Sequence, residues 1–592
     1  MPYNMLLLDD LRTSIGINLA HSVVIFDEAH NLVEAVNQIY SSNLSSLDLA
    51  IASRCMAEYR DRFQSLLTGK NYFYVNILTS VIAGFEILLN GEREAASNKS
   101  RSGGGVVTAP TADTKISSAP SSSSEVLSAN ELLFRCRLDN VNMLKLKRHI
   151  AETNLIEKAG GYADHAAKRR AAAAAELSRS SVAVNTKQSK KTSQCVENQA
   201  VRGASIVPNE NGCGDCSASN QSGRKVSASI DFNSNVNAMR KITEMITCLA
   251  NNDADGRVSV TRCRAASNGG QQDAVSSFKF ILLNPSVHFK KIVDEARSVI
   301  LLGGTLKPFA YLKSFLYPHL SPDKMRIFSC GHVVSRSNVL TVVACKGPKG
   351  NALEFTHGTR MQPCYLQELY SSLKNISSLV PNGIVVFFSS YQYMGAVIAN
   401  WRTTGMYADL AASRHLFIEP RLAVDAEILW LEYSKQAVTG IGVEGEKQDR
   451  SRHGAMLFCV MGGKLSEGIN FSDELARCVV VVGMPYPDGR DAVLQEKLKF
   501  ANSIEKDENA GKRLYEAMCM RTVNQCIGRS IRHINDYAAI VLLDCRYAQP
   551  GVIAQLPTWL AKDIEPCTNF QDVESRLRTF FKARAAIQHI QE

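Results

Sequence analysis

The sequence predicts an α/β protein whose parallel sheets are interrupted by a helical insertion containing disordered stretches. Three observations predict this fold class. Short, fully apolar runs recur along the chain, as expected for strands that are buried on both faces. From residue 278 onward these runs alternate with helical patterns, which is typical of right-handed βαβ units. Nearly every run ends in a polar or glycine-rich cluster, and open α/β sheets bind ligands at the carboxyl ends of their strands.

The strand-like runs form two groups, one near the N-terminus and one beyond residue 277. Between them, apolar residues recur at three- and four-residue steps along 75–89 and 239–249, and a further helix is expected at about 130–152. The α/β part is therefore split by an insertion. The predicted strands are Val23–Phe26, Phe278–Leu283, Val299–Leu302, Ile384–Phe388, Met456–Val460, Val479–Val482 and Ala538–Leu543.

We expect three regions. Two polar stretches, about 91–128 and 166–232, cannot bury enough apolar surface to offset chain entropy and are expected to be disordered. Basic clusters in the second stretch favour a solvated linker over a nucleic-acid site or a nuclear address. The regions are a first α/β domain of residues 1–40 with 272–312, an insertion of residues 41–271, and a second α/β domain of residues 313–592.

Composition indicates a protein of the cytosol or nucleus. The 592 residues allow two to four domains, and the net charge of +10 permits a polyanionic partner without requiring one. No apolar run approaches the roughly 18 residues of a membrane helix and no signal peptide is recognisable, so we expect no membrane partner. The 16 cysteines suggest core thiols. Cys213 and Cys216 have metal-ligand spacing but stand alone, and we expect them not to bind metal.

Two acidic residues, Asp27 and Glu28, directly follow the run Val23–Phe26. At the carboxyl end of a buried parallel strand, such a pair suits a nucleoside triphosphatase. The first acid can hold Mg²⁺ on the phosphates, and the second can orient or deprotonate the attacking water. The alternative is a solvated acidic turn, which the pair alone would favour. The clusters at the other strand ends favour the nucleoside triphosphatase interpretation instead.

Four further strands end in clusters that suit a phosphate or ribose ligand. Such clusters combine glycines, which let the backbone approach a ligand, with hydroxyl, amide and lysine groups. One glycine-rich turn alone would be weak evidence, but four in one region are hard to explain as ordinary turns. The clusters are Gly303-Gly304-Thr305, Ser389-Ser390-Tyr391, the loop from Gly462 to Phe471, and Gly483-Met484-Pro485-Tyr486-Pro487.

The segment from Leu514 onward predicts a helix that presents Gln525, Arg529 and Arg532 on one face, at positions i, i+4 and i+7. Such a face can hold a γ-phosphate, and arginine suits the charge that develops during phosphoryl transfer. Val523, Ile527 and Ile531 lie on the opposite side and are expected to face the core. A surface helix with solvated arginines is the alternative, and the strand that ends at Asp544 favours the functional interpretation.

These segments resemble the motifs of superfamily 2 helicases of the XPD-like branch. Within that branch the chain is most similar to the ChlR-type DEAH-box DNA helicases linked to sister-chromatid cohesion. The resemblance covers residues 1–90 and 275–565. The matching segments are Asp27-Glu28-Ala29-His30 for motif II, Gly303-Gly304-Thr305 for motif III, Ser389-Ser390-Tyr391 for motif IV, Gly463 to Phe471 for motif V and Gln525 to Arg532 for motif VI.

The resemblance implies two RecA-like domains with ATP and Mg²⁺ between them, an Arch-like insertion in the first, and 5′→3′ movement on single-stranded or forked DNA. It further implies a nuclear enzyme of replication, repair and cohesion, with cohesion and replication-fork proteins as partners. By position, Asp27 would hold Mg²⁺, Glu28 would activate water, and Gln525, Arg529 and Arg532 would reach the γ-phosphate. The other implied nucleotide-side residues are Gly303, Thr305, Glu467, Gly468 and Asn470. The weaker DNA candidates are Ser389, Tyr391, Trp401 and Lys464, and for Trp401 a place in the core is at least equally favoured.

Two family features are missing from this sequence. A phosphate-binding loop of the form G-x-x-x-x-G-K-[S/T] is expected upstream of motif II, and none occurs. The four cysteines that hold a [4Fe–4S] cluster in the family are also absent from that place. The sequence therefore reads as an N-terminally truncated form, for which we expect little or no ATPase activity alone and an exposed sheet edge.

Two rival interpretations remain. A DEAH-type RNA helicase is disfavoured because its motif III usually reads Ser-Ala-Thr, where this chain has Gly303-Gly304-Thr305. A DNA-binding or scaffold protein that kept the fold and lost motor activity is the non-enzymatic alternative for this polypeptide.

Overall fold

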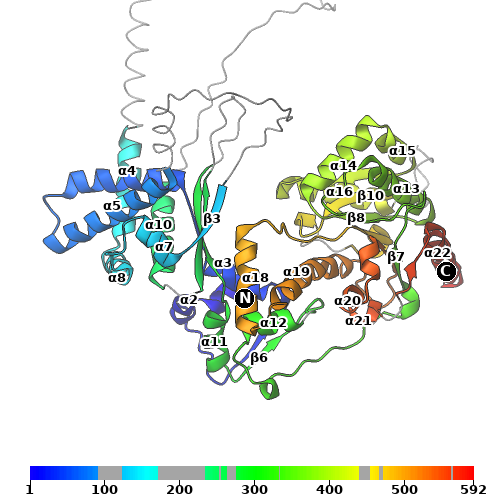
Figure 1. The fold of residues 1–592 in the computed structure, drawn as a ribbon, viewed down its shortest axis with the longest axis horizontal. Coiled ribbons are helices and arrows are strands. Elements are labelled where there is room, and N and C mark those ends of the chain that lie inside the picture. Colours follow the sequence, from blue (N-terminus) through cyan, green and yellow to red (C-terminus); the bar gives the residue numbers. More distant parts are fainter. Residues whose placement is uncertain are drawn as a thin grey trace, which may run out of the picture. The chain divides into compact units, whose positions relative to one another are not determined.

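The computed structural model describes two compact units. Unit 1 comprises Met1–Ile39 with Leu283–Glu592, and unit 2 comprises Tyr40–Leu282 (Figure 1). Most of the predicted low-complexity residues, together with Cys213 and Cys216, lie outside the described residues. The described residues are 1–90, 123–170, 234–251, 255–262, 275–307, 309–332, 334–438, 454–465, 471–561 and 564–591.

Unit 1 contains a seven-stranded sheet in which every neighbouring pair of strands is parallel. The α/β fold class is thus confirmed, and the four predicted strands of this region are present. Three more were not predicted: β7, β9 and the two-residue β13. In spatial order the strands are β13 (Pro566–Cys567), β7 (Val339–Ala344), β12 (Ala538–Leu543), β11 (Cys478–Val482), β8 (Ile384–Phe388), β10 (Ala455–Val460) and β9 (His415–Ile418).

Helices cover both faces of this sheet, which explains why its strands read as continuous apolar runs. Because successive side chains of a strand point to opposite faces, Val386 and Phe388 pack on one side and Val385 and Phe387 on the other. Each such side chain is fully buried, a change worth about 1.5–3 kcal/mol relative to exposure. The first face packs against α13 (Pro363–Leu379), α14 (Tyr391–Thr403), α15 (Met406–Ser413) and α22 (Phe570–Gln591), and the second against α16 (Ala423–Val438) and α19 (Ala510–Ile527).

A second, two-stranded parallel sheet in unit 1 joins the N-terminal strand to the segment after the insertion. It pairs β1 (Val23–Phe26) with β6 (Ser298–Leu301) in register. Phe26 is buried, but Ile25 remains 56% exposed, so within the described residues this sheet is covered on one face only. The flanking helices are α1 (Tyr3–Leu7), α2 (Asp9–Ser14), α3 (Leu32–Ile39), α11 (Ser286–Glu295) and α12 (Phe309–Leu316).

The predicted strand Phe278–Leu283 exists, but its expected place in a parallel sheet was wrong. It forms β5 (Ser277–Leu282), one of the two inner strands of a four-stranded antiparallel sheet in unit 2. The sequence carries the reason, because Phe278 and Phe280 are buried while Lys279 between them is exposed. That alternation is typical of a sheet with one covered face. The sheet order is β2 (Ser42–Ser45), β5, β4 (Gly256–Arg262) and β3 (Ser123–Ser128).

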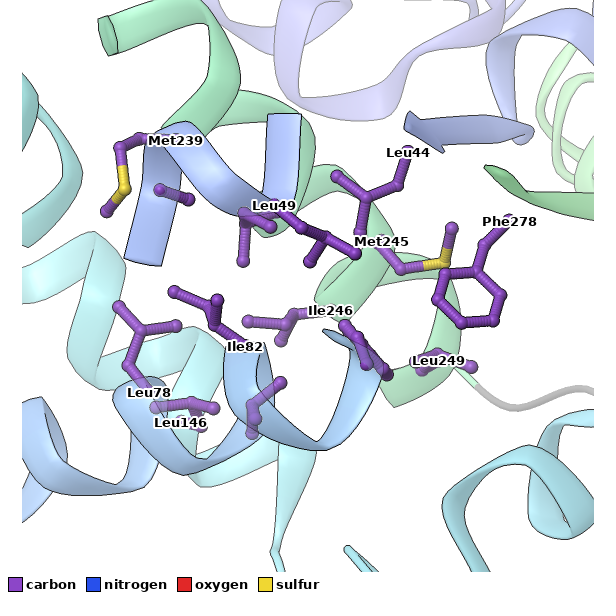
Figure 2. Packing of buried hydrophobic residues seen from close by; sticks show 14 of the residues in the cluster. Leu44, Leu49, Leu78, Ile82, Leu146, Met239, Met245, Ile246, Leu249 and Phe278 are labelled. Atoms are coloured by element: carbon purple, nitrogen blue, oxygen red, sulfur yellow. The ribbon is translucent and has the colours of Figure 1, made fainter. Parts of the chain in front are cut away.

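The helices of unit 2 pack beside this sheet around one apolar core, which Figure 2 shows from close by. The predicted stripe on α5 is buried, from Val75 to Leu89, and so are Met239 and Leu249 on α10. The insertion is therefore not purely helical, since sheet and helices share its core. The helices are α4 (Ser46–Phe63), α5 (Gly69–Asn90), α7 (Ala129–Arg135), α8 (Met143–Thr153) and α10 (Ser234–Ala250).

A capping box fixes the start of α4. The Ser45 hydroxyl accepts a hydrogen bond from the Asp48 backbone at 3.1 Å, and the Asp48 carboxylate accepts one from the Ser45 backbone at 3.1 Å. The same carboxylate pairs with Lys241 on α10 at 2.9 Å. One side chain thus ties the sheet, α4 and α10 together.

One described helix is long and apolar enough to cross a membrane by length and composition alone. It is the 21-residue stretch Gly69–Leu89 of α5, so the expectation that no segment approaches the length of a membrane helix does not hold by this criterion. Leu78, Ile82 and Phe85 of this helix lie in the core of unit 2. The core of a soluble domain produces the same pattern, so this is weak evidence for a membrane span.

Candidate functional site

The two predicted acids lie on a tight turn at the carboxyl end of β1. Glu28 adopts a left-handed backbone conformation with φ 49°, and its N–H donates to the Asp27 carboxylate at 3.0 Å. The neighbouring strand holds this turn, because Ala29 N–H donates to the Leu302 carbonyl at 2.8 Å. The Tyr3 hydroxyl donates to the Asp27 carbonyl. Both acidic side chains are thereby left exposed at the strand end.

His30 connects the acidic turn to the cluster that follows β6. Its Nδ1 lies 3.2 Å from the Glu28 carboxylate and 3.4 Å from the Thr305 hydroxyl. Burial lowers the pKa of His30, and Arg521 and Arg529 lower it further, although Glu28 and Glu34 act in the opposite direction. Burial therefore favours the neutral imidazole, which can join an acid to a hydroxyl without adding charge.

Gly303 and Thr305 lie beside the acidic turn, as predicted from their place at a strand end. A Cβ on Gly303 would lie 3.6 Å from Ala29 N and 3.1 Å from the Leu306 side chain. The same cluster reaches the second predicted motif, because a Cβ on Gly528 would lie 3.5 Å from the Thr305 methyl group. The strand ends of β1 and β6 and the end of α19 therefore meet.

The predicted helical face for the arginines was wrong in one respect. Helix α19 ends at Ile527, and Arg529 and Arg532 lie on the turn that follows rather than on the helix. Gly528 N–H donates to the Asn524 carbonyl at 2.9 Å, and the following residues form 3₁₀-type bonds that tighten the chain. Gln525 stays on the helix, half-buried, and Val523, Ile527 and Ile531 are buried as predicted.

Although the helix ends early, the turn brings the arginines and the acids into one electrostatic environment. Burial and the neighbouring Arg529 lower the pKa of Arg532, whereas the charge of Glu28 acts to raise it. Arg529 in turn lowers the pKa of His30 on the acidic turn. The turn after β1 and the turn after α19, which come from opposite ends of the chain, thus lie near enough for Glu28 to act on Arg532 and for Arg529 to act on His30. Carboxylates suit Mg²⁺ and guanidiniums suit phosphate oxygens.

Asp536, which sequence reasoning missed, holds the arginine turn in place. It is 1% exposed and accepts a hydrogen bond from Arg532 N–H at 3.2 Å. Its other oxygen pairs with the buried guanidinium of Arg477 at 2.9 Å. Asp473, His533 and Asp536 are near enough to hold a metal ion, but Asp536 is already engaged by Arg477. We therefore interpret this cluster as a structural element that holds the arginine turn, and not as a metal site.

A second unpredicted group lies one turn before Gln525 on α19. Arg521 on α19 makes hydrogen bonds of 2.8 Å to both carboxylate oxygens of Glu34 on α3, and donates to the His30 carbonyl at 3.3 Å. The Tyr311 hydroxyl approaches the same carboxylate at 3.4 Å. His30, Thr305, Tyr311 and Arg521 also line a small cavity. The sequence did carry a signal for Arg521, because it lies four residues before Gln525 and therefore on the same face of the helix.

The predicted DNA candidates divide into exposed and buried residues. Lys464 is exposed, and Ser389 and Tyr391 are half-buried at the carboxyl end of β8. Trp401 is fully buried, and its Nε1 donates to the Leu366 carbonyl at 3.3 Å. A ring with no exposed surface cannot stack on a base, so the alternative place in the core is the one that Trp401 occupies. Glu467, Gly468 and Asn470 fall outside the described residues.

Comparison with known proteins shows that this chain is similar in sequence to helicases. A model described as "Helicase C-terminal domain" matches residues 373–563, and one described as "DEAD_2" matches residues 1–49. The "ATP-dependent DNA helicase DDX11" of Danio rerio is 34% identical over 588 residues, which cover 98% of this chain and 60% of the relative. Over nearly its whole length, the chain is thus similar in sequence to proteins named DDX11 and chl1. The "ATP-dependent DNA helicase chl1" of Schizosaccharomyces pombe is 30% identical over 99% of the chain.

The chain spans about three-fifths of the length of the curated relatives that it matches. A solved structure titled "Structure of S. tokodaii Xpd4" matches 95% of this chain and 81% of that one, with 15% identity and a TM-score of 0.47. A likeness at that level carries no argument about function. The relatedness of the sequences and the geometry of unit 1 carry the proposal below.

The described residues fit Mg²⁺ and the phosphates of ATP, but not the third implied group, the [4Fe–4S] cluster. Asp27, Glu28, Arg529 and Arg532 offer oxygen ligands for Mg²⁺ and donors for phosphate. The [4Fe–4S] cluster does not fit the described part of the chain, where no group of cysteines comes within ligand distance. Many of these thiols are core residues, and burial raises the pKa of Cys55 to about 11. Such thiols are inert rather than poised for a metal.

Proposed function

We propose that this chain forms the motif II to motif VI part of an ATP-dependent DNA helicase. The observation that supports the proposal is that the segments after β1, β6 and α19 meet: a Cβ on Gly528 would lie 3.5 Å from the Thr305 methyl group, and the charge of Glu28 acts to raise the pKa of Arg532. Sequence relatedness to proteins named ATP-dependent DNA helicases supports the same reaction class.

In the proposed reaction, Asp27 would hold Mg²⁺ and Glu28 would orient or deprotonate the attacking water. Arg529 and Arg532 would stabilise charge on the transferred phosphoryl group, with Gln525 beside them. Gly303 and Thr305 would carry a change at the nucleotide from the acidic turn to α19, through His30. Glu467, Gly468 and Asn470 stay sequence-based candidates for the link between nucleotide and DNA.

The proposed substrate is single-stranded or forked DNA, with movement in the 5′→3′ direction. Lys464 is the exposed candidate for a phosphate contact, and Ser389 and Tyr391 lie beside its loop. Work in replication, repair and sister-chromatid cohesion, in the nucleus and with the proteins of those processes, follows from the resemblance alone. An iron–sulfur cluster remains an implication of the family with no ligand set among the described residues.

For the isolated 592-residue chain we propose DNA binding with little or no ATP hydrolysis. Its sequence has no phosphate-binding loop to hold the β- and γ-phosphates. A DNA-binding or scaffold role without motor activity is therefore the second candidate for this polypeptide, supported by the same missing loop. A DNA-stimulated ATPase activity measured on the purified chain would contradict this part of the proposal.

The role of Glu28 can be tested in the longer zebrafish relative, at the position equivalent to Glu28. Replacing this glutamate by glutamine keeps the shape and removes the base, so ATP turnover is expected to fall by roughly 10²–10⁴. Affinity for single-stranded DNA, measured by fluorescence anisotropy, should be retained. Full turnover in the glutamine variant would rule out the proposed role of Glu28.

A further inference from the structure

We infer that Glu419 is a positioning residue that holds Tyr391 and the Met461–Leu465 loop in a single arrangement for DNA contact. The inference rests on the proposed function, in which Lys464 of this loop and Tyr391 at the start of α14 are proposed to contact DNA. It changes the role of Tyr391 from a direct contact to a support for the loop.

Glu419 is buried where three elements of the seven-stranded sheet end. It directly follows β9, is 3% exposed, and its N–H donates to the Phe458 carbonyl of β10 at 2.9 Å. One carboxylate oxygen accepts from Val460 N–H at 2.7 Å. The other accepts from Leu465 N–H and from the Tyr391 hydroxyl, both at 2.9 Å. One side chain thus connects the start of α14, the end of β10 and the loop.

The loop is shaped to lie against this carboxylate. A Cβ on Gly463 would come within 2.6 Å of one Glu419 oxygen and 2.8 Å of the other, so only glycine fits. Gly462 takes φ +73°, in the left-handed region that favours glycine. Met461 N–H donates to the Phe388 carbonyl at 2.9 Å, which fixes the loop at its other side.

The chemistry of the site requires an acceptor-only side chain. All three partners of Glu419 are hydrogen-bond donors, and a carboxylate offers acceptors on both oxygens. Glutamine has the same shape, but its NH₂ group would face a donor in either orientation. Burial, together with the bond to Glu419, raises the pKa of Tyr391 to about 12, so its hydroxyl stays protonated and donates.

The Tyr391 hydroxyl is therefore committed within the protein. It donates to Glu419, and its oxygen lies 3.5 Å from Lys464 N–H. The side chain of Lys464 is exposed beside it and is free to meet a DNA phosphate. Glu419 would then affect DNA binding only indirectly, by fixing the position of Lys464 in the loop.

A double-mutant cycle on the full 592-residue chain tests this link. The variants are Glu419→Gln, Lys464→Gln and both together, with Glu432→Gln on the exposed face of α16 as the charge-matched control. The probe is a fluorescein-labelled oligothymidylate, titrated at several salt concentrations. Each single variant should bind roughly three- to tenfold more weakly, with a log–log salt slope smaller by about 0.7, as for one lost phosphate contact. The double variant should bind no more weakly than Lys464→Gln alone.

The inference would be overturned if the losses of affinity for the oligothymidylate multiplied in the double variant. It would also be overturned if Glu419→Gln bound the oligothymidylate as tightly as wild type. Hydrogen exchange on the same proteins gives a second reading that does not need DNA. The amides of Val460 and Leu465 should exchange faster in Glu419→Gln, while those of β11 stay protected. If Glu419→Gln does not fold, Tyr391→Phe replaces it, and unchanged exchange of Leu465 in that variant refutes the inference.

The two proposals fail in different ways. A wild-type chain that does not bind the oligothymidylate would defeat the proposed DNA binding of this polypeptide. The exchange rates of Val460 and Leu465 would still decide whether Glu419 holds the loop.

Discussion

Arg521 and Glu34 form a paired hydrogen-bonded salt bridge, with both guanidinium–carboxylate distances at 2.8 Å. Glu34 lies on α3, shortly after the acidic turn, and Arg521 lies on α19, about two helical turns before Arg529. The geometry is the bidentate arrangement that gives Arg–carboxylate pairs their directional strength. This pair therefore sets the distance between the two turns of the candidate site before any ligand enters.

We predict that Arg521→Met loosens α3 from α19. The guanidinium is 18% exposed and its partner 38%, so solvent screens the pair and its loss should cost only about 0.5–2 kcal/mol. Hydrogen exchange of α3 amides measures this directly. In a cycle with Glu34→Gln, the double variant should lose less than the sum of the singles, and strictly additive losses would show that the pair contributes nothing.

We predict that Asp536→Asn destabilises the second α/β domain and displaces Arg532. The change removes the shortest ion pair of the Arg477 guanidinium, which is 4% exposed, and leaves it only the longer contacts to Glu474 at 3.3 Å and Asp473 at 4.0 Å. Breaking such a buried pair costs about 3–5 kcal/mol, which urea unfolding followed by tryptophan fluorescence can measure. Asp507→Asn, in an exposed pair with Arg513, is the matched control and should leave the urea midpoint almost unchanged, because solvent screens that pair.

We predict that Gly463→Ala disrupts the loop beside Glu419, because its Cβ would lie 2.6 Å from a buried carboxylate oxygen. Loss of oligothymidylate affinity and faster exchange of the loop are the expected results. Gly395→Ala on α14 adds the same methyl group where nothing lies within 4 Å. That control should be neutral or stabilising by up to about 1 kcal/mol, and equal effects of the two changes would contradict the prediction.

We predict that Asp48 makes unit 2 sensitive to acid. Burial alone would raise its pKa, but hydrogen bonds from Ser45 and Lys241 lower it below the ordinary 3.8. The stability it provides is therefore present above pH 3.8 and lost as the pH falls through the lower value of the folded state. Asp48→Asn should unfold more readily at neutral pH, and its deficit relative to wild type should shrink below pH 3.8. A constant deficit would show that the titration of Asp48 does not matter.

Much of the sheet was predictable from the sequence because burial on both faces leaves an uninterrupted apolar signal. β8, β10, β11 and β12 were found for that reason. β9 was missed because all four of its residues are only half-buried at the sheet edge. The antiparallel β5 was placed in the wrong sheet because its last three residues are all buried and resemble a continuous apolar run, although Lys279 is exposed.

The candidate site was predictable where a motif follows a strand, as for Asp27, Glu28 and Thr305. The arginine turn was harder, since the periodicity of α19 runs on smoothly while the helix itself ends at Ile527. The residues that hold the site together were not predictable. Asp536, Glu34 and Glu419 act through partners far away in sequence, and a single sequence does not reveal such pairs.

The antiparallel sheet of unit 2 has a consequence for synthesis of the chain. Its strand β2 precedes the low-complexity stretches, while the partner β5 follows them. On a ribosome, β2 and the helices after it emerge long before β5 can pair with them, so the nascent unit must wait with part of its apolar surface open. The order of these strands thus delays burial of the apolar surface of unit 2 until β5 has been synthesised.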